Sequence, residues 1–308
     1  MRKPRALQPG DRIAIVAPAS SFSTEEFQAG LVELTALDFV PGYEISVFER
    51  ATYTAGPPEV RAAALRSAWA DPDVAGIIAA RGGYGSVHLL PLLRRAEFDG
   101  PPKVFVGYSD NTSLLIWLTL TCGIVTFHGP MIDGRLSRGP GAYDRDSFLR
   151  CVARPTPVGR ITGPSVEVLR AGDAAGMLIG GTMTQLAASL GTPYAFDPPQ
   201  GCVLFLDEVG ERPYRIDRLY TQLQLAGIIG RASALVFNEL PRCEEPSGTP
   251  GIRDVLVELT RGFAGPVLFG LPSGHTNGAT LTIPFGVTAR VNTGVRPGLI
   301  IDESAVQP

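Results

Sequence analysis

The sequence contains few residues that bind metal ions or form disulfides. Its 308 residues include only 3 histidines and 4 cysteines. The cysteines lie far apart and no two of them form a Cys-x-x-Cys pair; they are Cys122, Cys151, Cys202 and Cys243. This spacing disfavours a metal site or a disulfide framework and is typical of a protein in a reducing compartment. We therefore expect a cytoplasmic protein that uses no metal ion and no other cofactor.

Long hydrophobic runs and a strong net charge are also lacking. The longest apolar stretch, 114–125, is interrupted by threonines and is too short to span a bilayer. No apolar segment follows Met1, Arg2 and Lys3, so we expect no secretory signal. The formal net charge of −3 argues against nucleic acid or an anionic membrane as the main partner. The hydrophobic content of 44% is that of a globular protein, and the length suffices for one large domain or two ordinary ones.

Strand and helix patterns alternate along the first half of the chain. This alternation predicts parallel strand pairing and a doubly wound α/β sheet, in which function lies at the carboxyl ends of the strands. The expected strands are 12–18, 43–48, 74–80, 104–106 and 124–127, and the expected helices follow Ser23, Gly56, Ser86 and Asn111. We place this N-terminal α/β domain at residues 1–155.

The pattern changes after Arg154. Prolines and glycines interrupt residues 156–176, so we expect a linker there. Residues 177–308 then mix strands and helices and predict a second, mixed α/β domain. The two domains would hold an active site in the cleft between them.

Ser109 lies on the stretch 103–120, where a buried strand gives way directly to a helix. A serine on such a sharp turn, with small residues two places before and after it, is typical of a nucleophile elbow. Gly107 fits this pattern, and Asn111 tolerates a left-handed backbone. The N–H of Asp110 would then face a developing oxyanion. On this stretch alone, a simple helix cap at Ser109 and Asp110 is the favoured explanation, because the Gly-x-Ser-x-Gly pattern is incomplete.

A serine nucleophile needs a base, usually histidine, and a carboxylate that orients the base. Of the three histidines, His88 lies in an expected helix, and His128 follows a strand, where it could face the cleft or fix a turn. His275 lies in a tight Gly-His turn that would project its imidazole. Asp207 and Glu208 end another expected strand, and because neighbouring strand residues face opposite ways, only one of them can reach the base.

The segment 81–85, Arg-Gly-Gly-Tyr-Gly, is rich in glycine and precedes a helix. It matches neither the dinucleotide-binding pattern nor the P-loop pattern. In a hydrolase, the glycine backbone could approach the substrate and supply a second oxyanion donor from the N–H of Gly83.

Taken together and in this order, several segments resemble the LD-carboxypeptidases, the serine peptidases that include murein tetrapeptide carboxypeptidases and microcin C immunity peptidases. The resemblance runs from Pro9-Gly10-Asp11 to Pro284-Phe285-Gly286. It rests on the segments 80–85, 107–110, 180–181, 213–218 and 274–275. It implies a serine, glutamate and histidine triad divided between two domains, with Ser109 as the nucleophile and His275 as the base.

The sequence departs from this family at the carboxylate. The family usually has Leu-Glu-Asp before its Pro-Tyr-Arg helix, whereas this chain has Leu206-Asp207-Glu208. Counting back from Tyr214 places Asp207 on the catalytic position, and a local twist that brings Glu208 in remains the alternative.

The resemblance implies a serine peptidase that cleaves the amide between an L-centre and a terminal D-residue of a small peptide, as in a murein tetrapeptide. Arg81 would bind the terminal carboxylate, and Gly83 and Asp110 would hold the oxyanion. A self-immunity peptidase with the same triad, acting on a peptidyl-nucleotide, is the nearest alternative. From another class, a non-catalytic two-domain protein could bind a small molecule in the cleft. The sequence leaves a homodimer open.

Overall fold

The first of two sheets is built mainly from the N-terminal half of the chain. The computed structural model describes residues 1–308. This sheet has six strands in the order β12-β5-β4-β3-β1-β2. The strands of the N-terminal half are parallel to one another, and β12, from near the C-terminus, pairs antiparallel with β5. The strands are β1 (Arg12–Val16), β2 (Val40–Tyr43), β3 (Val74–Ala79), β4 (Val104–Gly107), β5 (Thr126–His128) and β12 (Ile283–Phe285).

The strand order determines on which face of the sheet each helix lies. The chain leaves β1 toward β2 at one edge and returns past β1 to β3, so right-handed crossovers place α1 and α2 on opposite faces of the sheet. Ser23 caps α1 by accepting a hydrogen bond from the N–H of Glu26 at 3.3 Å. The helices are α1 (Thr24–Ala36), α2 (Pro58–Ala70), α3 (Thr112–Ile116) and α4 (Arg145–Val152). The predicted parallel, doubly wound sheet is therefore confirmed.

One strand prediction in this unit is wrong. The second strand is Val40–Tyr43, which pairs with β1 from Arg12 to Ile15. Ile45–Phe48, expected to be its core, forms a 3-10 helix instead, and Ile45 is 81% exposed. The apolar residues at 45–48 suggested a buried strand, but only Val47 among them is buried.

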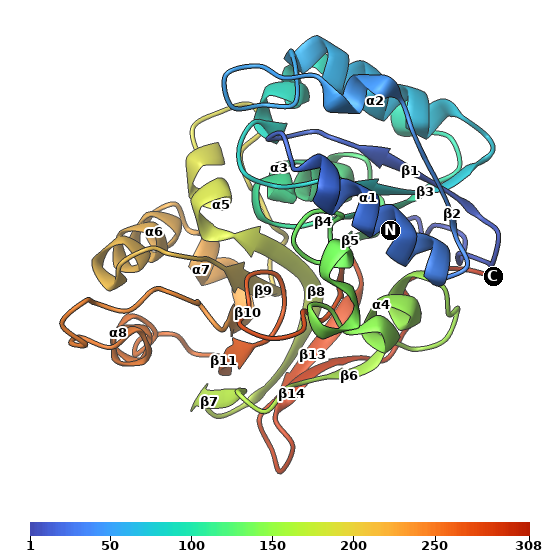
Figure 1. Ribbon diagram of the computed structural model, residues 1–308. Coiled ribbons are helices and arrows are strands. Elements are labelled where there is room, and N and C mark those ends of the chain that lie inside the picture. Colours follow the sequence, from blue (N-terminus) through green and yellow to red (C-terminus); the bar gives the residue numbers. More distant parts are fainter.

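The second sheet belongs to the C-terminal half and contains eight strands in the order β6-β14-β13-β8-β9-β10-β11-β7. The neighbours β8, β9, β10 and β11 are parallel, whereas the flanking strands are antiparallel. Figure 1 shows β8 as a long strand that leads into α5 beside the first unit. The strands are β6 (Gly159–Ile161), β7 (Glu167–Arg170), β8 (Asp173–Thr182), β9 (Cys202–Asp207), β10 (Ala232–Asn238), β11 (Val267–Leu271), β13 (Thr288–Asn292) and β14 (Gly298–Ile301). The helices are α5 (Met183–Ser189), α6 (Pro213–Leu225), α7 (Ile228–Arg231) and α8 (Ile252–Leu259).

Residues 156–176, expected to form an irregular linker, contribute regular structure to this second sheet. They contain β6, β7 and the start of β8. Pro157, Gly163, Pro164 and Gly172 lie outside the short strands, while Gly159 and Gly176 lie within β6 and β8, and these residues hide the strands in the sequence pattern. The two units also share apolar packing, because one cluster of buried side chains spans both. The chain ends meet as well: Arg5 forms a bridge with Gln307, and the termini lie on the same side of the molecule in Figure 1.

The β8–β9 ladder allows a prediction about stability. At Gly180, φ is +149° and an added Cβ would lie 1.9 Å from the carbonyl oxygen of Phe205 on β9. Gly180→Ala should lower the free energy of unfolding by roughly 3 kcal/mol, since two backbones would have to separate. Gly100→Ala is the matched control, because its added Cβ meets nothing within 4 Å. Urea unfolding of both variants measures the difference, and equal midpoints would contradict the prediction.

Candidate active site

Ser109 lies on the sharp turn between β4 and α3. Its φ is +62°, a left-handed conformation that is strained for a residue with a side chain. The turn is tightly packed: a Cβ on Gly82 would lie 2.9 Å from the Cβ of Ser109, and one on Gly107 would lie 3.1 Å from that of Asn111. Small residues at these places let the turn form, and the strained backbone presents the Ser109 hydroxyl at the carboxyl end of the sheet.

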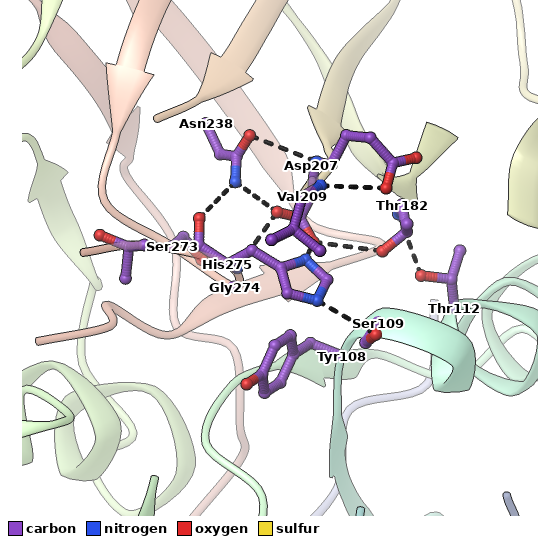
Figure 2. Close-up of polar contacts among 12 residues, drawn as sticks. Tyr108, Ser109, Thr112, Thr182, Asp207, Val209, Asn238, Ser273, Gly274 and His275 are labelled. Carbon is purple, nitrogen blue, oxygen red and sulfur yellow. Dashed lines mark hydrogen bonds and ion pairs between the residues drawn. The ribbon is translucent and has the colours of Figure 1, made fainter. Parts of the chain in front are cut away.

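Three side chains form a continuous hydrogen-bonded series (Figure 2). The Oγ atom of Ser109 lies 3.1 Å from Nε2 of His275, and Nδ1 of His275 lies 2.8 Å from Oδ2 of Asp207. Ser109 follows β4 of the first sheet, Asp207 ends β9 of the second, and His275 lies in the loop after β11. The site therefore exists only where the two units meet.

Asp207 is fully buried, and several donors surround its carboxylate. Thr182 donates its hydroxyl to Oδ2 at 3.1 Å, Asn238 donates to Oδ1, and the backbone N–H of His275 donates to Oδ1 at 3.2 Å. Burial by itself would raise the pKa of Asp207, but His275 and His128 beside it hold that pKa well below its ordinary value. Asp207 is therefore an ionised, oriented carboxylate.

The pKa of His275 is shifted by opposing effects. Burial of its imidazole lowers the pKa, while the negative charge and hydrogen bond of Asp207 raise it, and the net result lies above the ordinary value of 6.5. A histidine with this partner is a stronger base than free imidazole. It can accept a proton from Ser109 and hold the resulting charge against Asp207.

Glu208, the alternative carboxylate, points away from His275. Its Oε2 atom accepts hydrogen bonds from the backbone N–H of Thr184 at 2.9 Å and from the Thr184 hydroxyl at 2.7 Å. Its Oε1 atom accepts from the N–H of Val209 at 3.0 Å. Burial raises the pKa of Glu208. Glu208 thus holds the first turn of α5, and the structure does not place it in the hydrogen-bonded series.

The expected oxyanion donors, Gly83 and Asp110, are chain neighbours of the contact around Ser109. Gly82 lies against Ser109, Gly83 lines the same hollow as Ser109, and Asp110 is the next residue in the chain. No protein acceptor is found for the backbone N–H of Gly83 or of Asp110. The Asp110 side chain acts elsewhere, because its carboxylate accepts from the N–H of Ser86 at 2.7 Å and from Gln185 at 3.1 Å. The bond from Gln185 connects the turn at Ser109 to α5 of the other unit.

The hydroxyl of Ser109 opens into a polar hollow of about 660 Å³ between the units. Four arginines line it: Arg81, Arg135, Arg138 and Arg242. Arg81 is half-exposed, donates to the carbonyl of Ser21 at 2.9 Å and lies 3.6 Å from the carboxylate of Asp133. Such a lining favours a substrate that carries carboxylates.

Several residues around His275 were missed by sequence reasoning. Arg135 donates to four backbone carbonyls, three of them in the His275 loop: Gly274 at 2.9 Å, Thr276 at 3.1 Å and Gly278 at 3.0 Å. Nothing in the sequence marks Arg135 for this position. Asn238 also donates to the carbonyl of His275 at 2.5 Å.

A signal for two of the missed residues was available. Thr182 and Asn238 are polar residues at the ends of buried strands, and parallel strands bring their carboxyl ends together. The histidine His88, in contrast, lies apart from the site, beside Arg61 and Tyr84.

A serine on a strained turn, a histidine and a buried carboxylate, joined by hydrogen bonds, have the geometry of a serine hydrolase site. Comparison with known protein families agrees with this class. Residues 13–129 match the LD-carboxypeptidase N-terminal domain, and residues 175–291 match the LD-carboxypeptidase C-terminal domain. The chain belongs to the LD-carboxypeptidase family, as the sequence motifs predicted.

Individual relatives cover nearly the whole chain. A putative carboxypeptidase of Streptomyces coelicolor is 37% identical over 94% of this chain and 93% of its own length. The murein tetrapeptide carboxypeptidase of Pseudomonas aeruginosa is 30% identical over 92% of this chain and 94% of its own. Among solved structures, the muramoyltetrapeptide carboxypeptidase of Oxalobacter formigenes is 29% identical, with a TM-score of 0.83 over 96% of this chain and all of the other. A microcin C7 self-immunity protein, 23% identical, shares the fold over both full lengths with a TM-score of 0.92.

Two matched variants test which carboxylate orients His275. Asp207→Asn should lower kcat by roughly 10⁴-fold, because the amide keeps the shape but no longer accepts the proton of Nδ1. Glu208→Gln should cost about tenfold or less, since Glu208 faces α5. Equal, mild losses in both variants would contradict the assignment.

The pH dependence of activity tests independently whether Asp207 or Glu208 acts on His275. The base acts when neutral, so kcat/KM should rise with pH through the raised pKa of His275. Removing the charge of Asp207 lowers that pKa, and the acidic limb should move to lower pH in Asp207→Asn. It should stay near its original position in Glu208→Gln.

Proposed function

We propose that the protein is a serine LD-carboxypeptidase, which hydrolyses the amide between an L-centre and a C-terminal D-amino acid, as in a murein tetrapeptide. The observation that carries the proposal is the series Ser109–His275–Asp207 opening into an arginine-lined hollow. The murein tetrapeptide carboxypeptidase of Pseudomonas aeruginosa supports this substrate class. The proposal includes a cytoplasmic location and a small peptide as the partner, with no metal ion or other cofactor in any step. Light scattering would determine whether the protein forms a homodimer.

The proposed reaction has two stages. Ser109 attacks the scissile carbonyl carbon while Nε2 of His275 takes the hydroxyl proton, and the N–H groups of Gly83 and Asp110 stabilise the oxyanion. The C–N bond then breaks, His275 gives its proton to the departing amine, and the rest of the peptide stays esterified to Ser109. Water, deprotonated by His275, attacks the ester carbon and the C–O bond to Ser109 breaks. The peptide leaves as a carboxylic acid and His275 returns the proton to the Ser109 oxygen. Asp207 stabilises the charged imidazole in both stages.

A carboxypeptidase must also recognise a free C-terminus, and we propose that Arg81 provides the cation. Its chain neighbour Gly82 lies against Ser109, and Arg81 and Ser109 line the same hollow. The carboxylate of Asp133, at 3.6 Å, is beyond hydrogen-bond distance, and 47% of the Arg81 side chain is exposed. Arg242, which lines the hollow from the loop after β10 of the second sheet, has no ion-pair or side-chain hydrogen-bond partner and is the second candidate.

Two other functions share this architecture. The microcin C7 self-immunity protein of Escherichia coli is 27% identical over 78% of this chain, and such a peptidase would use the same triad on a peptidyl-nucleotide. The non-catalytic alternative, a two-domain protein that binds a small molecule, would leave Ser109 inert toward an active-site serine reagent. The hydrogen bond between Ser109 and His275 favours the enzyme.

The decisive experiment is mass spectrometry of the products of a synthetic murein tetrapeptide that ends in D-Ala, beside its L-Ala isomer. The enzyme should release D-Ala and leave the L-Ala isomer intact. Ser109→Ala should retain the fold and lose turnover by several orders of magnitude, because the nucleophile is gone. Cleavage of both isomers, or full turnover by folded Ser109→Ala, would refute the proposed reaction.

Amidation of the substrate tests the carboxylate anchor. If Arg81 binds the terminal carboxylate, the amide of the D-Ala peptide should have a kcat/KM lower by about 10- to 100-fold, as for the loss of a charge-assisted hydrogen bond. Arg81→Gln should weaken cleavage of the acid and remove most of the preference for acid over amide. Arg242→Gln is the matched control from the second unit. If it removes the preference and Arg81→Gln does not, the anchor is Arg242.

A further inference from the structure

A second histidine lies behind the triad. His128 ends β5 of the first sheet, and its side chain is completely buried. Its ring packs at an angle against Tyr108, Phe205 and Phe285, with ring centroids 5.1 to 5.9 Å away. Nothing in the reaction described above uses this imidazole, yet it is the buried titratable group that the first unit places against Asp207.

The two ring nitrogens of His128 have different surroundings. Nδ1 lies 3.3 Å from the hydroxyl oxygen of Ser273, which can donate its single proton either to Nδ1 or to the carbonyl of Leu281 at 2.9 Å. When Ser273 donates to Nδ1, the proton of a neutral imidazole lies on Nε2. Nε2 is buried without any hydrogen-bond partner, and it lies 3.7 Å from Oδ2 of Asp207. That oxygen is the one that accepts the hydrogen bond from Nδ1 of His275.

Electrostatics determines whether Nε2 of His128 carries a proton. A bare nitrogen lone pair aimed at an ionised carboxylate in a dry interior would repel it, and the nitrogen would remain unsatisfied. A proton on Nε2 makes the same contact attractive. Gly274 makes this arrangement possible: a Cβ there would lie 2.5 Å from Cε1 of His128 and 2.9 Å from Oδ2 of Asp207.

We propose that His128 is a positioning residue for Asp207, with a proton on Nε2 directed at Oδ2. Asp207 then lies between two imidazoles, and His128 keeps its carboxylate aimed at His275 while charge develops there. The contact of 3.7 Å is longer than a hydrogen bond and needs to shorten by about half an ångström, as catalytic contacts do in reacting complexes. His128 is buried and acts through Asp207, so substrate binding should hardly depend on it. The catalytic part of this inference rests on the proposed function.

The first test reads the proton directly in the unmodified protein. Nitrogen-15 NMR distinguishes protonated from bare ring nitrogens. The chain has only three histidines, and their signals are assigned with His88→Gln and His275→Gln. A protonated Nε2 on His128 is the expected result, whereas a bare Nε2 overturns the proposal whether or not the peptide is the right substrate.

The second test is kinetic. His128→Phe should lower kcat by about 10- to 100-fold with KM changed less than threefold, the usual cost of losing an orienting partner. His128→Gln, which keeps an N–H donor, should recover part of that loss. His88→Phe is the matched control, and its kcat should stay near that of the unmodified enzyme.

A double-mutant cycle separates positioning from packing. In the Asp207→Asn background, His128→Phe should cost less than about threefold, because its target is already lost. An equal loss in both backgrounds, or an unchanged kcat in His128→Phe, overturns the positioning role. If His128→Phe fails to fold, the NMR test still decides. An unmodified protein without peptidase activity would refute the proposed function instead, and the NMR result would stand apart from it.

Discussion

The structure depends on keeping one ionised carboxylate, that of Asp207, inside a dry interior. A buried charge is costly unless hydrogen bonds and an opposite charge compensate for it, and removing a partner is strongly destabilising. Here the compensation comes from Thr182 at the end of β8, Asn238 at the end of β10 and the backbone and ring of His275. The carboxylate therefore holds together the ends of three parallel strands and the catalytic loop.

Parallel pairing explains why these groups meet. Thr182 and Asp207 are register partners at the carboxyl ends of β8 and β9, and Asn238 ends the next strand. In the other sheet, Gly107 and His128 are register partners at the ends of β4 and β5, and Ser109 follows two residues later. The two sheets thus present their carboxyl ends to one another. Neither unit alone contains the serine, the histidine and the aspartate of the hydrogen-bonded series, so the proposed reaction requires the packed pair.

Local patterns in the sequence predicted the parts of this site that depend on backbone turns. The strand-to-helix turn at Ser109 and the Gly-His turn at His275 each follow from a few neighbouring residues. The choice between Asp207 and Glu208 follows from strand alternation only after the position of His275 is known. Here Asp207 faces the cleft and Glu208 faces α5.

The groups that sequence reasoning missed act over long separations. Arg135 donates to the carbonyl of Gly274, 139 residues further along the chain, and Asn238 donates to Asp207, 31 residues before it. The contact of Arg135 depends on how the two sheets pack, which no local pattern encodes, whereas Asn238 and Asp207 lie at the ends of neighbouring strands of one sheet. The prediction of a strand at 43–48 was wrong at residues 45–48, because apolar residues form a strand only where a neighbouring strand pairs with them.

Arg135, one of the arginines that favour an anionic substrate in the hollow, opposes the protonation of His275, the proposed base. The charge of Arg135 lowers the pKa of His275, as burial does, and Asp207 raises it by more, so the net shift is upward. Arg135 spends its donors on carbonyls, which stiffen the loop without cancelling its positive charge. The positive charge that attracts an anionic substrate therefore lowers the pKa of His275 and weakens it as a base. The fully buried Asp207 reconciles them, because its charge acts on His275 at 2.8 Å through protein, whereas the arginines border a solvated hollow where their charge is screened.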